Sequence, residues 1–415
     1  MAETLLDIRN LRIEATTYPP GEKPKTITIV DDVSLTLEKG KVLGLIGESG
    51  AGKSTIGLSP MGYGRGGVRI TGGEVILNGR DILRQGRNGI RRLRGKEVCY
   101  VAQSAAAAFN PAQRLMDQVV ESSLKHGVAN RAEAERRAVA LFRKLSLPDP
   151  ENIGKRFPHQ VSGGQLQRVM TAMALCPEPD LIIFDEPTTA LDVTTQIDVL
   201  AAIKEAIHAT GVAALYITHD LAVVAQVADD IMVLRHGKMV EKGSTHQIIK
   251  EPQQAYTQAL VSVHHIEHQE KPPASKPILS VKNVTAAYGN GIVKVLKNVS
   301  VDIHPGQTLA VVGESGSGKS TLARAITGLL PPQEGEVVFD GRKLSNRLSD
   351  RKKDDLRQLQ MIYQMADVAM NPRHTVGTII GRPLTFYFGL RGAERDRRVK
   401  ELLEEIEMGT GFIDR

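Results

Sequence analysis

Three short apolar runs stand out in the first two thirds of the chain, and each ends in a distinctive polar segment. They cover residues 42–46, 181–184 and 214–217. Runs of this length, apolar at almost every position, are typical of strands buried on both faces of a parallel sheet. The polar segments that follow would meet at the carboxyl edge of that sheet, where nucleotides bind in such folds. The pattern predicts an α/β protein.

Two charged segments carry apolar residues at helical spacing. In the first, Asn130 and Glu133 form a capping pair at the start. Its apolar stripe consists of Ala134, Ala138, Leu141, Phe142 and Leu145. In the second, the stripe consists of Val399, Leu402, Leu403 and Ile406. We expect one amphipathic helix at each place.

A glycine-rich loop follows the first apolar run. Residues 47–55 match the G-x-x-x-x-G-K-S pattern, in which backbone N–H groups and a helix start surround a phosphate chain. Lys53 would reach the outer phosphates, and the Ser54 hydroxyl would hold Mg²⁺. One match could arise by chance, but residues 313–321 repeat it. The predicted ATP-binding residues of the first loop are Gly47, Ser49, Gly50, Gly52, Lys53, Ser54 and Thr55.

The loop belongs to a longer internal repeat. Asn78-Gly79 and Asp340-Gly341 are matched hairpin turns, and Gln103 is matched by Gln364. The predicted ATP-binding residues of the second loop are Gly313, Ser315, Gly316, Gly318, Lys319, Ser320 and Thr321. The second copy reaches Arg415, which aligns with Arg156 of the first copy. We therefore expect a complete domain at residues 1–263, a Pro-rich linker at 264–277 and the first half of a second domain at 278–415.

The first copy continues into its most chemically distinctive stretch. Ser162, Gly163, Gly164 and Gln165 precede a helical run and predict a second anion site, although such turns also serve as plain helix caps. Asp185 and Glu186 follow the second apolar run. Asp185 would contact Mg²⁺ through water, and Glu186 would polarise the attacking water. His219 follows the third run and could contact the γ-phosphate.

Composition limits the alternatives. A chain of 415 residues with 41% apolar and 24% charged residues is an ordinary globular protein of two domains. The net charge of +6 fits a dispersed solvated surface better than a nucleic-acid site. Cys99 and Cys176 provide neither a disulfide framework nor metal-ligand spacing. We expect no signal peptide and no transmembrane segment.

The order of these motifs resembles the ATP-binding subunits of ABC transporters. The matching motifs are Walker A (47–55), the Q-loop (Gln103), the signature (161–165, with Val161 where Leu is usual), Walker B (181–186), the D-loop (190–192) and the switch (His219). The resemblance implies a P-loop NTPase fold with an antiparallel β subdomain and a helical subdomain, using ATP and Mg²⁺. It makes Glu186, His219 and Gln103 catalytic. It adds Gln103, Ser320 and Gln364 as metal ligands beside Ser54 and Asp185.

Adenine normally stacks on an early aromatic residue in this family. Tyr288 matches that position in the second copy, whereas the first copy has Ala15 there, with Tyr18 as a substitute. Another departure follows Gln103, where residues 104–108 read Ser-Ala-Ala-Ala-Ala instead of the usual Asp-Pro pair. In the family this loop faces the permease.

Finer features resemble the peptide, opine and nickel importer branch. They are residues 185–196, 256–260 and 371–377. This resemblance implies an ATPase that energises import of oligopeptide-like solutes at the cytoplasmic face of a bacterial inner membrane, to which it would bind peripherally. Its partners would be two permease subunits, an extracytoplasmic solute-binding protein and a second nucleotide-binding domain. No nucleic-acid partner is expected.

The incomplete repeat leaves alternatives open. In this family each ATP lies between the Walker A loop of one domain and the signature of another, so neither site can be completed within this chain. The chain could be a fragment of a longer tandem protein, the product of a frameshifted gene, or a protein whose first domain pairs with that of another copy. Two other functions remain: a soluble tandem ABC ATPase acting on ribosomes or nucleic acid, and a hydrolysis-deficient ATP-binding protein.

Overall fold

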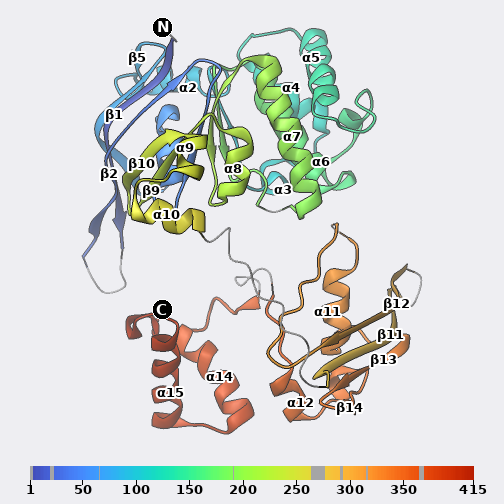
Figure 1. Cartoon of the computed structure of the whole chain (residues 1–415). Helices are drawn as coiled ribbons and strands as arrows, with labels where there is room; N and C mark the ends of the chain where they lie inside the picture. Colours follow the sequence, from blue (N-terminus) through green and yellow to red (C-terminus); the bar gives the residue numbers. More distant parts are fainter. Residues whose placement is uncertain are drawn as a thin grey trace. The chain divides into compact units, whose positions relative to one another are not determined.

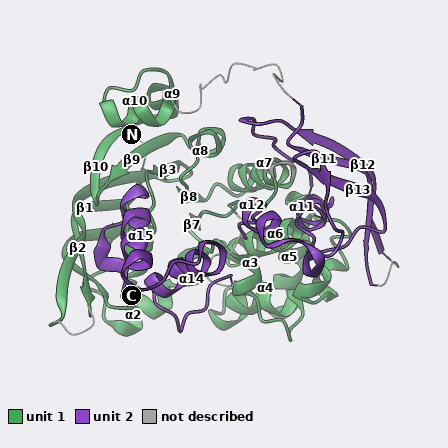
Figure 2. Cartoon of the chain, turned by 90° about the horizontal axis from the view of Figure 1, so that it is seen from below, with its two compact units in different colours: residues 1–269 green, residues 270–415 purple. Residues whose placement is uncertain are grey.

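The computed structural model describes residues 3–18, 23–64, 66–189, 191–262, 276–289, 293–314, 316–363 and 369–415. The chain divides into two compact units, residues 1–269 and 270–415 (Figure 2). Of the expected linker, only residues 276 and 277 are described. Ser315, Gln364 and Ala190 of the D-loop also lie outside the described residues.

A six-stranded sheet forms the centre of unit 1. Its strand order is β10-β9-β3-β8-β7-β6, parallel throughout except for the antiparallel edge pair β9 and β10. The strands are β3 (Val42–Ile46), β6 (Val98–Val101), β7 (Leu181–Asp185), β8 (Ala213–Ile217), β9 (Asp230–Arg235) and β10 (Lys238–Ser244). Every residue of β3, β7 and β8 is buried. The three apolar runs are therefore adjacent central strands, as their composition predicts.

A second, antiparallel sheet covers one face of the first. Its order is β2-β1-β4-β5, and its strands are β1 (Thr4–Thr17), β2 (Lys25–Glu38), β4 (Val68–Leu77) and β5 (Arg80–Asp81). Side chains alternate along β3, so Leu43 and Leu45 enter the core between the two sheets, together with Ile56 of α1 (Lys53–Leu58). Asn78 and Gly79 both have positive φ, which confirms the hairpin predicted between β4 and β5.

Helices cover the opposite face, where Val42 and Ile46 of β3 join a second core (Figure 1). The helices of this layer are α4 (Leu115–Lys125), α5 (Arg131–Lys144), α6 (Gly163–Leu175), α7 (Val193–Thr210) and α8 (Leu221–Val227). The Asn130 side chain caps α5 by accepting a hydrogen bond from the Glu133 N–H. All five residues of the predicted α5 stripe are buried. The other helices of unit 1 are α2 (Arg87–Leu93), α3 (Ala105–Ala108), α9 (Thr245–Lys250) and α10 (Ala255–Ser262).

Unit 2 repeats the antiparallel sheet and its helix but not the parallel sheet. Its elements are β11 (Leu279–Tyr288), β12 (Val293–Ile303), α11 (Lys319–Thr327), β13 (Glu334–Phe339), β14 (Arg342–Lys343), α12 (Lys353–Gln358), α14 (Val376–Phe388) and α15 (Gly392–Glu405), with sheet order β12-β11-β13-β14. Residues 307–314, which correspond to β3 and the start of the loop, contain no strand. Val312 is 82% exposed there, whereas Ile46 is 2% exposed. In unit 1, β3 pairs with β8 and β9, and the described part of unit 2 contains no counterpart of either.

The second amphipathic stripe is only partly as predicted. Val399 and Leu403 are buried in a small core, and Leu402 packs against it. The prediction is wrong for Ile406, which is 61% exposed because α15 ends at Glu405 and the chain turns away there. Among the described residues, no helix combines the length and apolar character that a membrane span requires.

Candidate active site

The glycine-rich loop of unit 1 connects β3 to α1 in the way that its pattern predicts. Gly47, Gly50 and Gly52 all have positive φ. At Gly47, a Cβ atom would lie 2.1 Å from the Leu234 carbonyl oxygen, so a side chain there would displace the end of β9. The remaining predicted residues, Ser49, Ser54 and Thr55, lie on this loop or in the first turn of α1.

Lys53 curls back over the loop. Its Nζ donates to the carbonyl oxygens of Gly47 at 2.7 Å and Glu48 at 2.9 Å, and the residue is only 6% exposed. Burial lowers the pKa of Lys53, while the charges of Glu186, Asp185 and Glu48 act in the opposite direction. An ammonium group held by two carbonyls beside a helix start can exchange those carbonyls for phosphate oxygens.

Asp185, the last residue of β7, accepts hydrogen bonds from two hydroxyl groups. Ser54 Oγ donates to its Oδ1 at 2.7 Å, and Tyr100 Oη donates to its Oδ2 at 2.7 Å. The sequence motifs place both Ser54 and Asp185 at the predicted Mg²⁺ site, but Tyr100 was not predicted there. The signal that could have found Tyr100 is its place on β6, a strand whose apolar run ends near Gln103 and which is the direct neighbour of β7.

Glu186 is contacted by both other predicted catalytic residues. His219 Nδ1 lies 3.2 Å from Glu186 Oε1, and Gln103 Nε2 lies 3.3 Å from Oε2. Thr189 Oγ1 donates to the same Oε2 at 3.2 Å. The Glu186 backbone has φ +50°, a conformation that is unfavourable for a residue other than glycine. Such strain clusters at functional sites, because there it aims a side chain.

The signature residues do not join this cluster. Ser162 caps α6 by accepting from the Gln165 N–H, and the Gln165 side chain accepts from the Ser162 N–H. These hydrogen bonds form a capping box, so the turn serves as a helix cap, one of the two roles predicted for it. Ser162 and Gly163 remain exposed at the helix start, while Gly164 is buried.

The second loop is arranged like the first but in different surroundings. Lys319 Nζ donates to the carbonyls of Gly313 and Glu314, each at 2.6 Å, and Gly316 and Gly318 again have positive φ. Tyr288 Oη lies 3.4 Å from the hydroxyl of Thr321, which is buried, and this contact lowers the pKa of Tyr288. Ser320 follows Lys319 in α11. In unit 1, Tyr18 is 75% exposed.

The donor set beside the first loop suits a small, hard cation. It consists of the Ser54 hydroxyl, the Asp185 carboxylate and the Gln103 amide, all oxygen donors of the kind that Mg²⁺ takes when it arrives with a nucleotide. Within the described residues there is no group of three His, Cys, Asp or Glu side chains placed to hold a metal ion by themselves.

The fold and this arrangement define a P-loop nucleotide-binding protein. The family model for ABC transporters matches residues 30–189 and 296–414, and the chain belongs to that family. It is thus an ABC-type ATPase with one full domain and part of a second.

Curated relatives extend over most of the chain. The glutathione import ATP-binding protein GsiA of Escherichia coli O6:H1 (strain CFT073) is 35% identical over 428 residues, covering 93% of this chain and 68% of GsiA. The GsiA of Shigella boydii serotype 4 is 34% identical, covering 98% of this chain and 71% of its own length.

Solved structures show the same fold. The dimeric ATP-binding cassette MJ0796 in a post-hydrolysis state bound to ADP and Pi has a TM-score of 0.50 at 24% identity, covering 58% of this chain and 99% of its own. The cbiO1 protein from Clostridium perfringens, part of the transporter complex cbiONQ, has a TM-score of 0.51 at 21% identity, covering 60% of this chain and 92% of its own.

Proposed function

We propose that this chain is the ATP-binding and ATP-hydrolysing subunit of an importer for oligopeptide-like solutes. The observation that carries the proposal is the contact of Glu186 with both His219 and Gln103, directly beyond the Asp185–Ser54 pair. Glutathione, which the GsiA relatives are named for importing, is a small peptide. That name supports the peptide-like substrate class.

The residues have separate tasks in the proposed reaction. The loop N–H groups and Lys53 bind the β- and γ-phosphates, and the Glu186 carboxylate orients and polarises the attacking water. His219, whose Nδ1 lies 3.2 Å from Glu186 Oε1, would face the γ-phosphate. Ser54, Asp185 and Gln103 are the residues that would hold a Mg²⁺ ion arriving with ATP, and the ion would supply positive charge beside the phosphates.

The proposed assembly needs other chains. A second nucleotide-binding domain would supply a signature to the Lys53 site, since Ser162 and Gln165 of the same unit bond to each other in the cap of their own helix. Two permease subunits and an extracytoplasmic solute-binding protein would complete the importer. The ATPase would then act peripherally at the cytoplasmic face of a bacterial inner membrane.

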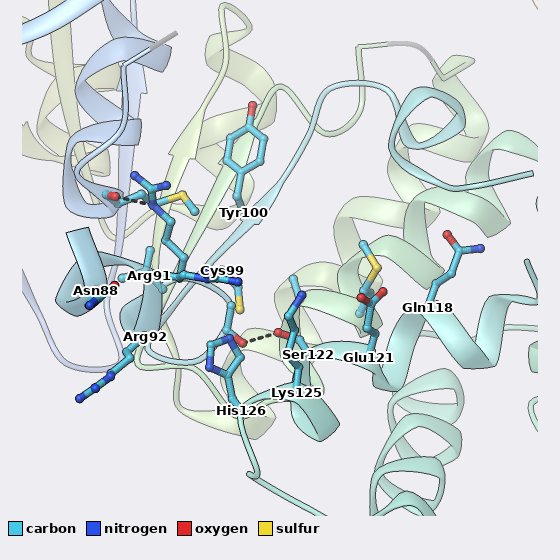
Figure 3. A pocket seen from close by; sticks show the side chains of 16 residues that line it. Asn88, Arg91, Arg92, Cys99, Tyr100, Gln118, Glu121, Ser122, Lys125 and His126 are labelled. Atoms are coloured by element: carbon cyan, nitrogen blue, oxygen red, sulfur yellow. Dashed lines mark hydrogen bonds between the residues drawn. The ribbon is translucent and has the colours of Figure 1, made fainter.

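A cavity of about 780 Å³ beside β6 is our candidate for the permease contact (Figure 3). Its lining includes Arg91 and Arg92 of α2, Lys125 and His126 at the end of α4, the acidic Glu121 and apolar side chains such as Met173. A mixed polar and apolar lining in which Arg and Lys outnumber the one Glu fits a short amphipathic helix that carries acidic residues.

The test of the proposed function is Glu186→Gln. This variant should bind ATP as the wild type does and lose at least about 100-fold in turnover, because the amide keeps the size of the side chain but cannot polarise the attacking water. Glu205→Gln, an exposed change on α7, is the matched control. Hydrolysis should be measured for the chain alone and with membranes that carry its permease. Wild-type turnover in the Glu186→Gln variant would disprove the assigned role.

A further inference from the structure

Helix α10 is fixed to the edge of the central sheet by one buried carboxylate. Glu241 of β10 is 8% exposed, and its two oxygens accept from the N–H groups of Gln253 at 2.9 Å and Gln254 at 3.1 Å. Burial raises the pKa of Glu241, but these hydrogen bonds and the neighbouring Thr257 hydroxyl together outweigh it, and the pKa lies below its ordinary value. The carboxylate is charged at neutral pH, so it holds the chain firmly where α10 begins.

The first turn of α10 carries Tyr256, whose ring contacts Arg235. The guanidinium carbon of Arg235 lies 4.7 Å from the ring centroid, within the range of a cation–π interaction. Arg235 is the last residue of β9, one position after Leu234, whose carbonyl lies against Gly47. Together with Glu48 and three other residues of α10, this pair surrounds a cavity of about 500 Å³. The glycine-rich loop and α10 thus face each other across it.

The Tyr256 hydroxyl is shielded from solvent and has no hydrogen bond of normal geometry among the described residues. Burial raises its pKa, the Glu48 backbone lowers it, the Glu48 carboxylate raises it and the Arg235 charge lowers it. A buried hydroxyl without a partner costs about 1–3 kcal/mol. A small shift of the Glu48 peptide would remove that cost.

Glu48 is the part of the loop whose contacts must change when phosphate binds. Its carbonyl and that of Gly47 hold the Lys53 ammonium at 2.9 and 2.7 Å. When a phosphate accepts the hydrogen bonds of the Lys53 ammonium, both carbonyls lose this donor. The Glu48 carbonyl then keeps one donor, the Ala51 N–H at 3.1 Å, and its peptide can adjust toward Tyr256, whose hydroxyl has no partner of normal geometry among the described residues.

We propose that Tyr256 is a positioning residue for the phosphate-binding loop, bonding to Glu48 through its hydroxyl when ATP is bound, with Arg235 holding the ring. The proposal rests on the proposed nucleotide site at Lys53. It makes α10 an element that responds to nucleotide. The described part of unit 2 provides no equivalent support for Glu314.

The experiment uses the full chain with Lys319→Ala, so that only the Lys53 site binds nucleotide. Tyr256→Phe keeps the ring on Arg235 and removes only the hydroxyl. It should weaken the Kd for ATP about three- to tenfold, the loss expected for one hydrogen bond. Tyr63→Phe is the matched control, because Tyr63 also lies under an arginine, with Arg94 5.3 Å from its ring centroid. A second readout is hydrogen exchange of the α10 amides. ATP should slow it in the parent but not in Tyr256→Phe.

Two outcomes overturn the proposal: ATP binding by Tyr256→Phe equal to that of the Tyr63→Phe control, or ATP protection of α10 that survives the change. Thermal unfolding separates a damaged fold from a lost contact, since Tyr256→Phe should unfold at the parent temperature. Failure of the proposed function has a different signature. In that case the parent itself does not bind ATP, or binds it equally well after Lys53→Ala.

Discussion

Tyr100 on β6 donates its hydroxyl to Oδ2 of Asp185, at 2.7 Å, across the edge of the central sheet. Because Ser54 occupies Oδ1 from the other side, the Asp185 carboxylate is held in one orientation by two neutral donors. One donor comes from the phosphate-binding helix and one from the strand that leads to Gln103. The proposed metal ligand is therefore aligned by two elements of the nucleotide site.

Tyr100→Phe should weaken the apparent affinity for Mg²⁺ during ATP hydrolysis while leaving the fold intact. Without the hydroxyl, Asp185 loses one of the two orienting hydrogen bonds described above, each worth about 1.5–3 kcal/mol to a charged acceptor. The Mg²⁺ concentration that gives half-maximal ATP hydrolysis should rise about three- to tenfold. ATP binding in excess chelator should not change. Tyr63→Phe again serves as the control, and an unchanged Mg²⁺ titration in Tyr100→Phe would show that Asp185 does not depend on Tyr100.

Removing the cap of α5 should cost stability without affecting nucleotide binding. The Asn130 side chain accepts from the Glu133 N–H at 3.0 Å, and its loss leaves one helix donor without a protein partner. Asn130→Ala should lower the free energy of unfolding of unit 1 by about 1 kcal/mol, as cap removals do. Urea unfolding followed by circular dichroism measures this. Asn130→Asp, which keeps the cap, should stay within about 0.5 kcal/mol of the wild type. Equal losses in both variants would contradict the capping role.

The buried thiol of Cys99 should make unit 1 less stable at alkaline pH. Burial raises the pKa of Cys99 to about 12, far above the ordinary value of about 8.5 for an unfolded thiol. As pH rises above about 9, the unfolded chain releases a proton that the folded chain keeps. This lowers the free energy of unfolding by at most about 1.4 kcal/mol per pH unit. Urea unfolding at pH 8, 9 and 10 should give a smaller decline in Cys99→Ala than in the wild type. Parallel declines in the two proteins would refute this assignment.

The contiguous motifs were predictable from sequence because their geometry is local. A glycine-rich loop after an apolar run fixes where Lys53 and Ser54 lie relative to the strand, and an apolar run that ends in two acids places Asp185 and Glu186 at its end. Tyr100 and Tyr256 gave no such signal. Each reaches the site only through tertiary pairing, one through the neighbouring strand and the other through a helix that Glu241 anchors.

The second loop shows the limit of apolar pattern as evidence for a strand. Residues 308–312 are as apolar as β3 but form no strand, because a central strand is made by its neighbours' hydrogen bonds and unit 2 supplies none in its described part. Ile406 shows the same limit at a helix end. Its spacing fits the stripe, but the helix stops one residue earlier, and spacing alone does not mark a terminus.

The two loops should contribute unequally to hydrolysis. Lys53 and Lys319 hold equivalent carbonyls, yet only the Lys53 loop has Asp185, Glu186 and His219 around it, and the described part of unit 2 contains no counterparts of these three. Lys53→Ala should therefore lower the rate of ATP hydrolysis at least about 100-fold, because the lysine that binds the phosphates and the acidic side chains proposed for hydrolysis lie in the same site. Lys319→Ala should retain most of the rate and lose one of two bound nucleotides in equilibrium dialysis. The reverse order of effects, with Lys319→Ala abolishing hydrolysis, would place the reaction at the second loop and remove Glu186 from the mechanism.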